Sequence, residues 1–335
     1  MADAQINVTF AGPLVTVQDA GRKGQMRYGV SASGPMDRLA FAAAHAALGN
    51  PAGGAAIEVS LGGLMLHCTR GNVTLAVAGG DFVIEHAGQK VTGWSVLTLR
   101  QGERLAIRAG KTGSWCYLAF AGELQTTRWL DSAATHAGSG FGGGALAAGQ
   151  VLHIADAALR EERTGEIPRP DLAPQPRLRV VAGPQDRYFA AGTLQQFTES
   201  SYRVTDAYDR MGMRLSGPAL SLDGALSIPS EPVVRGAVQV AGDGVPTVLL
   251  ADHQTTGGYP KIATVISADL DDLTQARSGA VVRFATVTPQ EAIVAARDRH
   301  AAISAYLERI AVPRGTLAQR LMRENLITAW PMDEA

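Results

Sequence analysis

Short apolar runs of strand length, most of them bounded by glycine, fill the first half of the chain. Several of these runs alternate apolar and polar residues with a period of two, which is typical of strands with one buried face. Glycine accounts for 38 of the 335 residues, and it readily adopts the positive φ that tight hairpin turns require. The sequence therefore predicts a mainly β fold. The strands expected in this half are 6–10, 56–60, 64–68, 73–78, 82–85, 95–99, 104–107, 115–120 and 151–154.

A change of composition at residues 159–176 predicts a linker between two domains. This segment contains four prolines and mixed charges without apolar periodicity, which is typical of extended inter-domain chain. We expect an N-terminal β domain over 1–158, a C-terminal β domain over 177–289 and a C-terminal helical extension over 290–335. The second domain is expected to contain strands 178–182, 201–205, 238–240, 245–251, 264–267 and 280–284. The expected helices are 38–49, 186–197, 269–276, 290–310 and 316–327, the first of them capped by Asp37.

The two domains are weakly alike in sequence. Each begins with a strand followed by Ala-Gly-Pro, at 11–13 and at 182–184, and a Gln-Asp pair comes shortly after, at 18–19 and at 185–186. This favours a tandem duplication of one β-barrel-like unit. The helical extension has two open interpretations: it is a surface for a partner or a second copy, or it packs onto the barrel.

Charge and composition exclude several classes of protein. The chain has 30 basic and 31 acidic residues and a pI of about 6.7, whereas a domain that binds nucleic-acid phosphates is usually clearly basic. We see no signal peptide and no apolar run long enough for a membrane span. Cys68 and Cys116 are expected to be buried free thiols, and the seven scattered histidines predict no metal site. A cytoplasmic protein is expected.

Two glycine-rich segments imitate nucleotide-binding motifs. Residues 138–143 match GxGxxG, but no helix follows them, and a packed or flexible loop is favoured. Residues 109–112 resemble the end of a P-loop but lack its first glycine. Since there is also no Met-Lys pair for biotin attachment, we expect no cofactor bound by this chain alone.

The first candidate site segment lies near the N-terminus. Gln18, Asp19, Arg22 and Ser33 bring an amide, a carboxylate, a guanidinium and a hydroxyl into one glycine-rich stretch. Such groups bind polar substrates well. An alternative stays open, in which the loop only satisfies itself and Asp19 pairs with Arg22.

A second candidate is Arg210, which could hold a substrate carboxylate or pair with Asp209. The third and densest segment follows the apolar run 247–251. Its glycines would let backbone N–H groups approach a polarised carbonyl, as in an oxyanion hole. Lys261 is the only lysine in the last 224 residues, and its ammonium differs chemically from a guanidinium. The residues singled out here are Asp252, His253, Gln254, Thr255, Thr256, Gly257, Gly258, Tyr259 and Lys261.

These segments also carry a family resemblance. The stretches GPLVTVQDAGRKG, GVSASGPMD, AIEVSLGG, AVAGGDF, YLAFAGE, DRMGMRLSGP, GAVQV and LLADHQTTGGYPKIATV resemble the family of biotin-dependent carboxyltransferases and 5-oxoprolinase C subunits. This family is also called allophanate hydrolase subunit 2 or the KipA group. The likeness runs from about residue 6 to residue 292. It implies two tandem cyclophilin-like β-barrel domains.

The resemblance implies three possible functions. The first is the C subunit of an ATP-dependent 5-oxoprolinase, which opens 5-oxo-L-proline to glutamate together with a homologous B subunit (allophanate hydrolase subunit 1 type) and a LamB/YcsF-type A subunit. The second is carboxyl transfer from carboxybiotin to a urea- or guanidine-like acceptor. The third is a non-catalytic partner of a kinase-inhibitor-type protein. Because this chain has no nucleotide or biotin motif, it is most similar to the 5-oxoprolinase component, and ATP would be used by the complex.

The chain departs from the family pattern at three positions. Ala133 and Gly138 stand where members commonly have arginines. If those arginines hold an anionic group of the substrate, this chain lacks them, and a neutral or differently charged substrate becomes possible. His253 stands where an arginine is usual, and histidine titrates near neutral pH.

We therefore expect a small cyclic or urea-like amide to bind between the loops containing Gln18–Arg22, Ser33 and Asp252–Lys261. Lys261 and nearby backbone N–H groups would stabilise charge on the amide oxygen. Asp252, His253 or Tyr259 would transfer protons, while Gln254 and Arg210 would orient the substrate.

Overall fold

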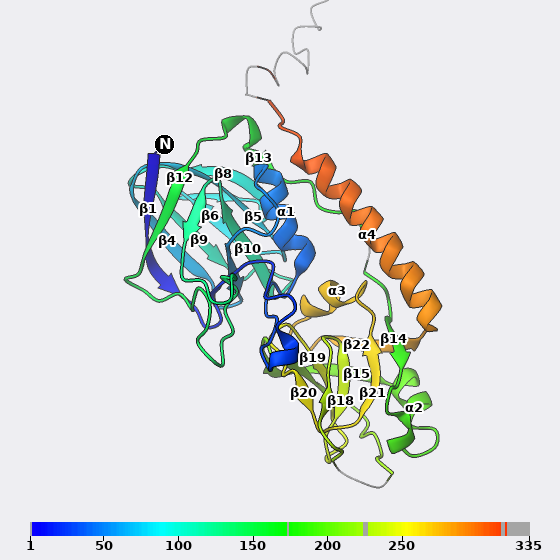
Figure 1. Ribbon diagram of the computed structural model, residues 1–335. Coiled ribbons are helices and arrows are strands. Elements are labelled where there is room, and N and C mark those ends of the chain that lie inside the picture. The colour runs from blue at the N-terminus through cyan, green and yellow to red at the C-terminus, as the bar shows by residue number, and fades with distance from the viewer. Residues whose placement is uncertain (1, 173, 224–226, 316–318, 320–335) are drawn as a thin grey trace, which may run out of the picture.

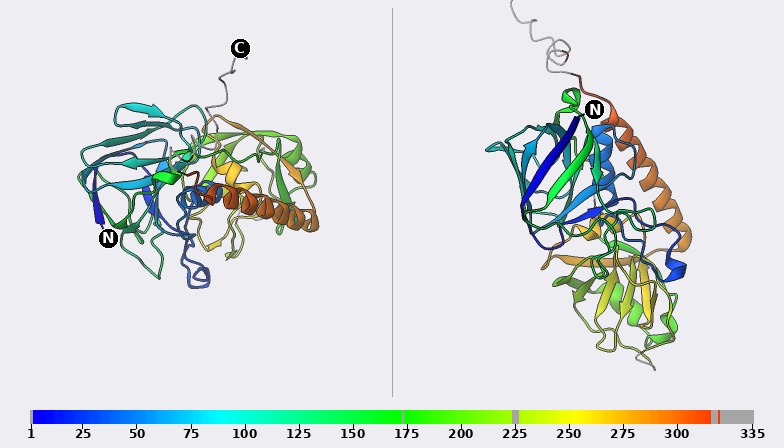
Figure 2. Two further views of the ribbon diagram at one scale, coloured as in Figure 1. Left: turned by 90° about the horizontal axis from the view of Figure 1, so that it is seen from above. Right: turned by 60° about the vertical axis from the view of Figure 1, so that its left-hand side comes forward.

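Two β domains lie end to end, and a long helix runs along one side of both (Figures 1 and 2). The computed structural model describes residues 2–172, 174–223, 227–315 and 319. The predicted mainly β class is confirmed.

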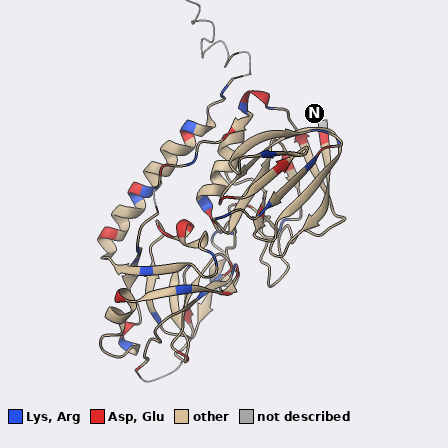
Figure 3. Cartoon of the chain, turned by 180° about the vertical axis from the view of Figure 1, so that it is seen from behind, with Lys and Arg blue, Asp and Glu red and all other residues tan. Residues whose placement is uncertain are grey.

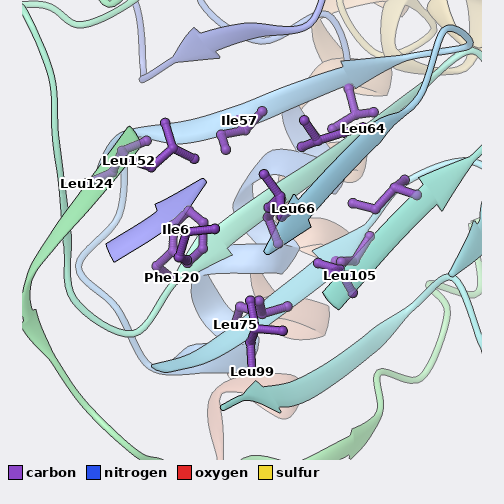
Figure 4. Packing of buried hydrophobic residues seen from close by; sticks show 14 of the residues in the cluster. Ile6, Ile57, Leu64, Leu66, Leu75, Leu99, Leu105, Phe120, Leu124 and Leu152 are labelled. Carbon is purple, nitrogen blue, oxygen red and sulfur yellow. The ribbon is translucent and has the colours of Figure 1, made fainter. Parts of the chain in front are cut away.

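The N-terminal domain contains two antiparallel sheets that enclose one apolar core. Side chains from both sheets meet in this core, which Figure 4 shows at close range. One sheet has the order β11 (Glu123–Gln125), β12 (Val151–Ala157), β1 (Ala2–Ala11), β4 (Leu64–Arg70), β9 (Arg104–Arg108), β6 (Val83–His86) and β7 (Gln89–Val91). The other has the order β13 (Gly165–Glu166), β8 (Ser95–Leu99), β5 (Val73–Ala78), β10 (Trp115–Phe120), β3 (Ala56–Ser60) and β2 (Thr16–Gln18).

The C-terminal domain is a closed seven-stranded barrel. Neighbouring strands are antiparallel except for β14 and β22, which are parallel and close the barrel. The order is β14 (Leu178–Ala182), β21 (Lys261–Val265), β18 (Ala237–Val240), β19 (Pro246–Leu249), β16 (Gly212–Ser216), β15 (Ser201–Tyr208) and β22 (Val281–Thr286). A separate two-stranded ribbon pairs β17 (Glu231–Pro232) with β20 (Thr256–Gly257). The two similar sequence blocks thus take different sheet arrangements.

Helix α1 (Arg38–Leu48) covers one sheet of the N-terminal domain. Asp37 caps it as predicted, since its carboxylate accepts a hydrogen bond from Ala40 N at 2.9 Å, and Gly49 ends it at a φ of 69°. The alanines of α1 pack against alanines of β5 and β10, and these small side chains allow a close approach of helix to sheet.

Helix α4 (Pro289–Ala311) corresponds to the predicted helix 290–310. Tyr306 and Ile310 are buried against α1, and Tyr306 Oη donates to Pro168 O at 2.8 Å. The described part of the extension therefore packs on the N-terminal domain as well as beside β14 of the barrel. Basic and acidic residues are interspersed along α4 (Figure 3). The predicted helix 316–327 lies outside the described residues.

The remaining helices are short. The predicted helix 186–197 is divided into a 3-10 turn, Asp186–Tyr188, and α2 (Thr193–Glu199), because Gly192 between them has a φ of 84°. The predicted helix 269–276 is α3 (Leu270–Thr274). Two further 3-10 turns are Met26–Tyr28 and Glu161–Arg163. The second lies in the predicted linker, as does β13, which pairs with β8.

Both cysteines are free and buried, as predicted, and burial raises the pKa of each thiol. Within the described ranges, none of the helices combines the length and the apolar character that a membrane crossing needs.

The buried imidazole of His45 in α1 predicts a loss of stability in acid. Burial lowers the pKa of His45 to about 4, so the folded protein holds it neutral while the unfolded chain protonates it near pH 6.5. Such a group makes its full contribution to stability when the pH is above the pKa of the unfolded chain. The contribution falls as the pH drops from that value toward the pKa of the folded state. We expect the His45 contribution to drop by about 2 kcal/mol between pH 7 and pH 5.

The measurement is urea unfolding of the wild type and His45→Gln at both pH values. The variant should lose less stability between pH 7 and pH 5 than the wild type. His153→Gln, at an exposed position on β12, serves as the matched control and should keep the wild-type dependence. An equal pH dependence in all three proteins would contradict the assignment.

Candidate functional site

A cavity of about 300 Å³ lies where loops of the two domains meet. The segment that follows β2, dark blue in Figure 1, reaches from the N-terminal domain to the barrel. The opposite wall is the segment that follows β19. The lining residues are Arg22, Gly29, Val30, Ser31, Trp129, His136, Ser139, Phe141, Met211, Asp252, His253, Gln254, Thr255 and Thr256.

The N-terminal wall is a loop that folds back on itself. Arg22 N donates to Ala32 O at 2.7 Å, which joins the two ends of the loop. Gly21 has a φ of 85°, and a Cβ at this position would lie 2.8 Å from Ala32 O. Only glycine therefore allows this closure.

Arg22 offers an unused hydrogen-bond donor. Its side chain is buried, with Nε donating to Trp129 O and Nη2 donating to Ala134 O. Nη1 has no partner among the described residues, although Arg22 lines the cavity. Because a buried donor without a partner is costly, Nη1 is suited to a ligand oxygen.

Gln18 and Asp19 support this loop and do not line the cavity. The Asp19 carboxylate accepts from Gly21 N, Ser132 Oγ and Ala133 N at 2.6–2.9 Å. Gln18 is fully buried and donates to Thr135 O. The alternative of a loop that satisfies itself is therefore wrong for these two residues, because most of their partners lie in the distant segment 132–135, and Asp19 forms an ion pair with Arg128 at 3.7 Å instead of with Arg22.

The C-terminal wall is held by a buried ion network. Arg210 donates from Nη2 to Asp252 Oδ1 at 2.8 Å and from Nε to Oδ2 at 3.0 Å. Its Nη1 is paired with Glu58 Oε1 on β3 of the other domain, and its Nη2 also donates to Gly34 O at 2.8 Å. All three charged side chains are at most 1% exposed. Arg210 therefore holds Asp252 and lies behind the cavity wall.

The network sets the ionisation of its members. Burial opposes ionisation of Asp252, but Arg210 holds the pKa of its carboxyl below the usual value. Burial likewise opposes the charge on Arg210, and Glu58 and Asp252 raise its pKa above the usual value. Tyr117 Oη donates to Glu58 Oε2 at 2.7 Å, and burial raises the pKa of Tyr117 well above normal. Asp252 is thus an anion at neutral pH.

Two neutral imidazoles face the cavity. His253 Nδ1 lies 2.6 Å from Gln254 O; because a carbonyl only accepts, Nδ1 carries the proton and Nε2 is free to accept one. Burial lowers the pKa of His253. His136 Nδ1 accepts from Ser139 N at 3.2 Å, which leaves its other nitrogen as the donor.

An aromatic pair forms the apolar side of the cavity. Trp129 and Phe141 are stacked with their ring centroids 4.2 Å apart, and the Arg22 guanidinium lies 5.3 Å from the Trp129 ring. Phe141 belongs to the glycine-rich loop 138–143. This loop contributes to the cavity wall, and a helix does not follow it.

The other predicted site residues are placed as follows. Ser33 is buried near Asp252 and influences its pKa. Thr255 and Thr256 line the cavity. The residues that do not line it are Gly257, Gly258, Tyr259 and Lys261. From Thr256 onward the chain forms the β17–β20 ribbon and then β21. The structure therefore brings Arg22 and the segment Asp252–Thr256 to the same cavity, as expected. Lys261 lies outside the lining of this cavity.

Ala133 and Gly138 border the site in different ways. Ala133 is fully buried in the apolar core and donates its N–H to Asp19. Gly138 lies in the loop beside His136.

Several residues of the site were not predicted from the sequence. Glu58 could have been noticed, since it is a carboxylate within the otherwise apolar strand Ala56–Ser60. Trp129, His136 and Phe141 had no sequence signal beyond their place near a glycine-rich loop. Over the described part of the chain, groups of three or more His, Cys, Asp or Glu side chains that could hold a metal ion are absent.

Chemically, the N-terminal wall of the cavity offers a cationic hydrogen-bond donor, and the C-terminal wall offers a carboxylate that accepts hydrogen bonds. Arg22 Nη1 can donate to a carbonyl oxygen, and Asp252 can accept from an N–H group. His253 Nε2 in the same cavity can take up a proton. An amide presents that combination of acceptor and donor.

Comparison with known proteins places the chain among carboxyltransferase-type proteins. The family "Carboxyltransferase domain, subdomain A and B" matches residues 28–286. The C subunit of 5-oxoprolinase from Haemophilus influenzae is 35% identical over 283 residues, covering 83% of this chain and 89% of the relative. The Escherichia coli protein of the same name is 32% identical over 329 residues, covering 96% and 100%.

A solved structure shows the same fold. The K. lactis urea amidolyase superimposes with a TM-score of 0.81 over 90% of this chain, at 24% identity. This chain spans 20% of that much longer protein.

The buried network predicts a large loss of stability in Arg210→Met. Removing Arg210 leaves two carboxylates buried without a counter-charge, which typically costs about 3–5 kcal/mol. Arg214→Met is the matched control, because Arg214 forms an exposed ion pair with Asp243 in the same barrel and should cost less than about 1 kcal/mol. Urea unfolding at pH 7 measures both changes. Similar losses in the two variants would contradict the role given to the network.

Proposed function

Because the chain belongs to the carboxyltransferase domain family, we propose that it is an amide-processing enzyme subunit of the same type as the C subunit of 5-oxoprolinase. The observation that carries the proposal is that Arg22, whose buried Nη1 has no partner among the described residues, lines the same cavity as the ionised Asp252. This chain is similar over most of its length to relatives named as the 5-oxoprolinase C subunit, and this similarity supports 5-oxoproline as the substrate.

The cavity suits a small lactam. 5-Oxoproline carries a carbonyl oxygen and an N–H group on adjacent ring atoms. In the proposed complex Arg22 Nη1 donates to the carbonyl oxygen and Asp252 accepts from the ring N–H. The stacked Trp129 and Phe141 cover the ring methylenes. Gln254, Thr255 and Thr256 supply further polar contacts along the opposite wall.

Ring opening adds water to the amide carbonyl and breaks the C–N bond. Arg22 stabilises the negative charge that develops on the oxygen. His253 Nε2 takes a proton from the attacking water and returns it to the departing ring nitrogen. The products are the γ-carboxylate and the amino group of glutamate. Lys261 and Tyr259 have no role at the amide in this proposal.

The reaction is proposed to use ATP and partner subunits. We propose that ATP is bound with a homologous B subunit of the allophanate hydrolase subunit 1 type and an A subunit of the LamB/YcsF type. The relatives are named as one subunit of 5-oxoprolinase, which supports action within a complex.

A second candidate is carboxyl transfer to urea. The fold likeness to the K. lactis urea amidolyase favours it, and urea offers the same carbonyl and N–H groups to Arg22 and Asp252. This function would need carboxybiotin from a partner protein.

The deciding experiment is an assay of the co-purified complex with ATP. We expect glutamate and phosphate to be released with 5-oxoproline, and no turnover of urea. Carboxylation of urea by a biotinylated partner would favour the second candidate. Complex formation without turnover of either substrate would favour a regulatory binding protein.

Arg22→Lys should lower kcat/KM of the complex by about 100-fold. The ammonium cannot reproduce the guanidinium fork that holds Trp129 O and Ala134 O while donating into the cavity, and a lost oxyanion donor typically costs this much. Arg100→Lys is the matched control, since Arg100 is an exposed partner of Glu161. Wild-type kcat/KM in Arg22→Lys would contradict the role of Arg22.

A further inference from the structure

A second buried polar cluster lies on the barrel, outside the active cavity. Gln239 on β18 and Lys261 on β21 are cross-strand partners. They are only 5% and 3% exposed. Neither Gln239 Nε2 nor Lys261 Nζ has a hydrogen-bond partner in the described ranges. Two adjacent buried donors without acceptors are costly.

The strand pattern explains why these side chains leave the barrel core. Val238, Val240 and Ile262 are the neighbours along the two strands, and all three are in the apolar core. Successive strand residues point to opposite faces. Gln239 therefore lies on the outer face. The register shifts by one residue after Val238, so that Ile262 and Ala263 both belong to the core, and Lys261 is paired opposite Gln239 on the outer face.

The β17–β20 ribbon covers this face. Gly257 lies so close that a Cβ would overlap Gln239 Nε2, so glycine lets the ribbon approach. Glu231 is opposite Gly257 in the ribbon. Val233 beside the ribbon packs with Ala237 and Leu249 in a small apolar cluster next to the two donors, but none of these side chains can accept a hydrogen bond from them.

The charges facing Lys261 are few. Glu231 is the acidic group that acts on it, and Gln185 Nε2 donates to the Glu231 carboxylate. Gln185 Oε1 accepts from the backbone N–H of Lys261 at 2.9 Å. Glu231 is therefore already held by a donor, while the ammonium is left without a bonded acceptor.

A surface cavity adjoins Gln239, although Lys261 is not among its lining residues. Gln239 lines a cavity of about 320 Å³ together with Tyr259, Gln254 and Met211. Gln254 Nε2 donates to Gln239 Oε1 at 3.1 Å. The side-chain oxygen of Gln239 is therefore engaged, whereas its Nε2 donor is not used by this bond. Gln254 and Met211 also line the active cavity, so the two cavities adjoin.

We propose that Gln239 and Lys261 form a second ligand site, which binds a small, singly charged carboxylate-type anion. Two donors and one positive charge match the oxygens of such an anion. The nearby Glu231 carboxylate disfavours a doubly charged anion such as phosphate. This site is independent of the proposed function.

The chain allows a direct test, because its other lysines, Lys23, Lys90 and Lys111, are all exposed. The variant Lys23→Arg/Lys90→Arg/Lys111→Arg keeps Lys261 as its only lysine. With ¹³C-labelled lysine, its Cε resonance reports on the site. Acetate is titrated at constant ionic strength, with chloride as the reference salt and inorganic phosphate as the second probe.

We expect a saturable shift of the Lys261 signal with acetate and a weaker response to phosphate. Gln239→Leu in the same background should weaken acetate binding by about tenfold or more. In the wild type, the three exposed lysines should show no saturable shift. A Lys261 response that does not saturate, or that chloride reproduces, would overturn the proposal, as would unchanged affinity in Gln239→Leu.

Discussion

The ion network of Arg210 with Glu58 and Asp252 determines how the two domains of this protein fit together. Charged groups lose their hydration when they are buried, and only close pairing compensates for that loss. Glu58 belongs to the first domain, whereas Arg210 and Asp252 belong to the second. A shifted docking that kept Glu58 buried but away from Arg210 would leave its charge without a partner, so the network favours one docked arrangement.

The active cavity depends on that docking, because each domain contributes one half of its chemistry. The cationic donor Arg22 comes from the first domain and the carboxylate of Asp252 comes from the second. Other contacts reinforce the same arrangement. Arg235 in the barrel domain donates to the carbonyls of Pro35 and Met36, next to the loop that carries Arg22. An isolated domain would therefore lack a complete site.

The sequence predicted what depends on local pattern. Short apolar runs separated by glycine turns located the strands 73–78, 95–99 and 115–120 to the residue, and glycine-rich polar loops indicated Arg22 and Asp252. It could not reveal that Asp19 is engaged by Ser132 and Ala133, because that contact joins segments more than 110 residues apart. Trp129 and Phe141 were missed for the same reason, since the position of Trp129 beside Arg22 and of Phe141 on Trp129 depends on how distant loops meet.

The segment Asp252–Lys261 shows why a single motif need not form a single site. Its first five residues follow β19 and line the active cavity. At Gly257 the chain pairs with Glu231 in the ribbon, and at Lys261 it joins β21 beside Gln239. Strand geometry then turns Lys261 toward the outer face of the barrel, under the ribbon. Gln254 is the residue that touches both regions, because it lines the active cavity and hydrogen-bonds Gln239. The density of polar residues in this motif thus reflects two adjacent polar sites with one shared wall.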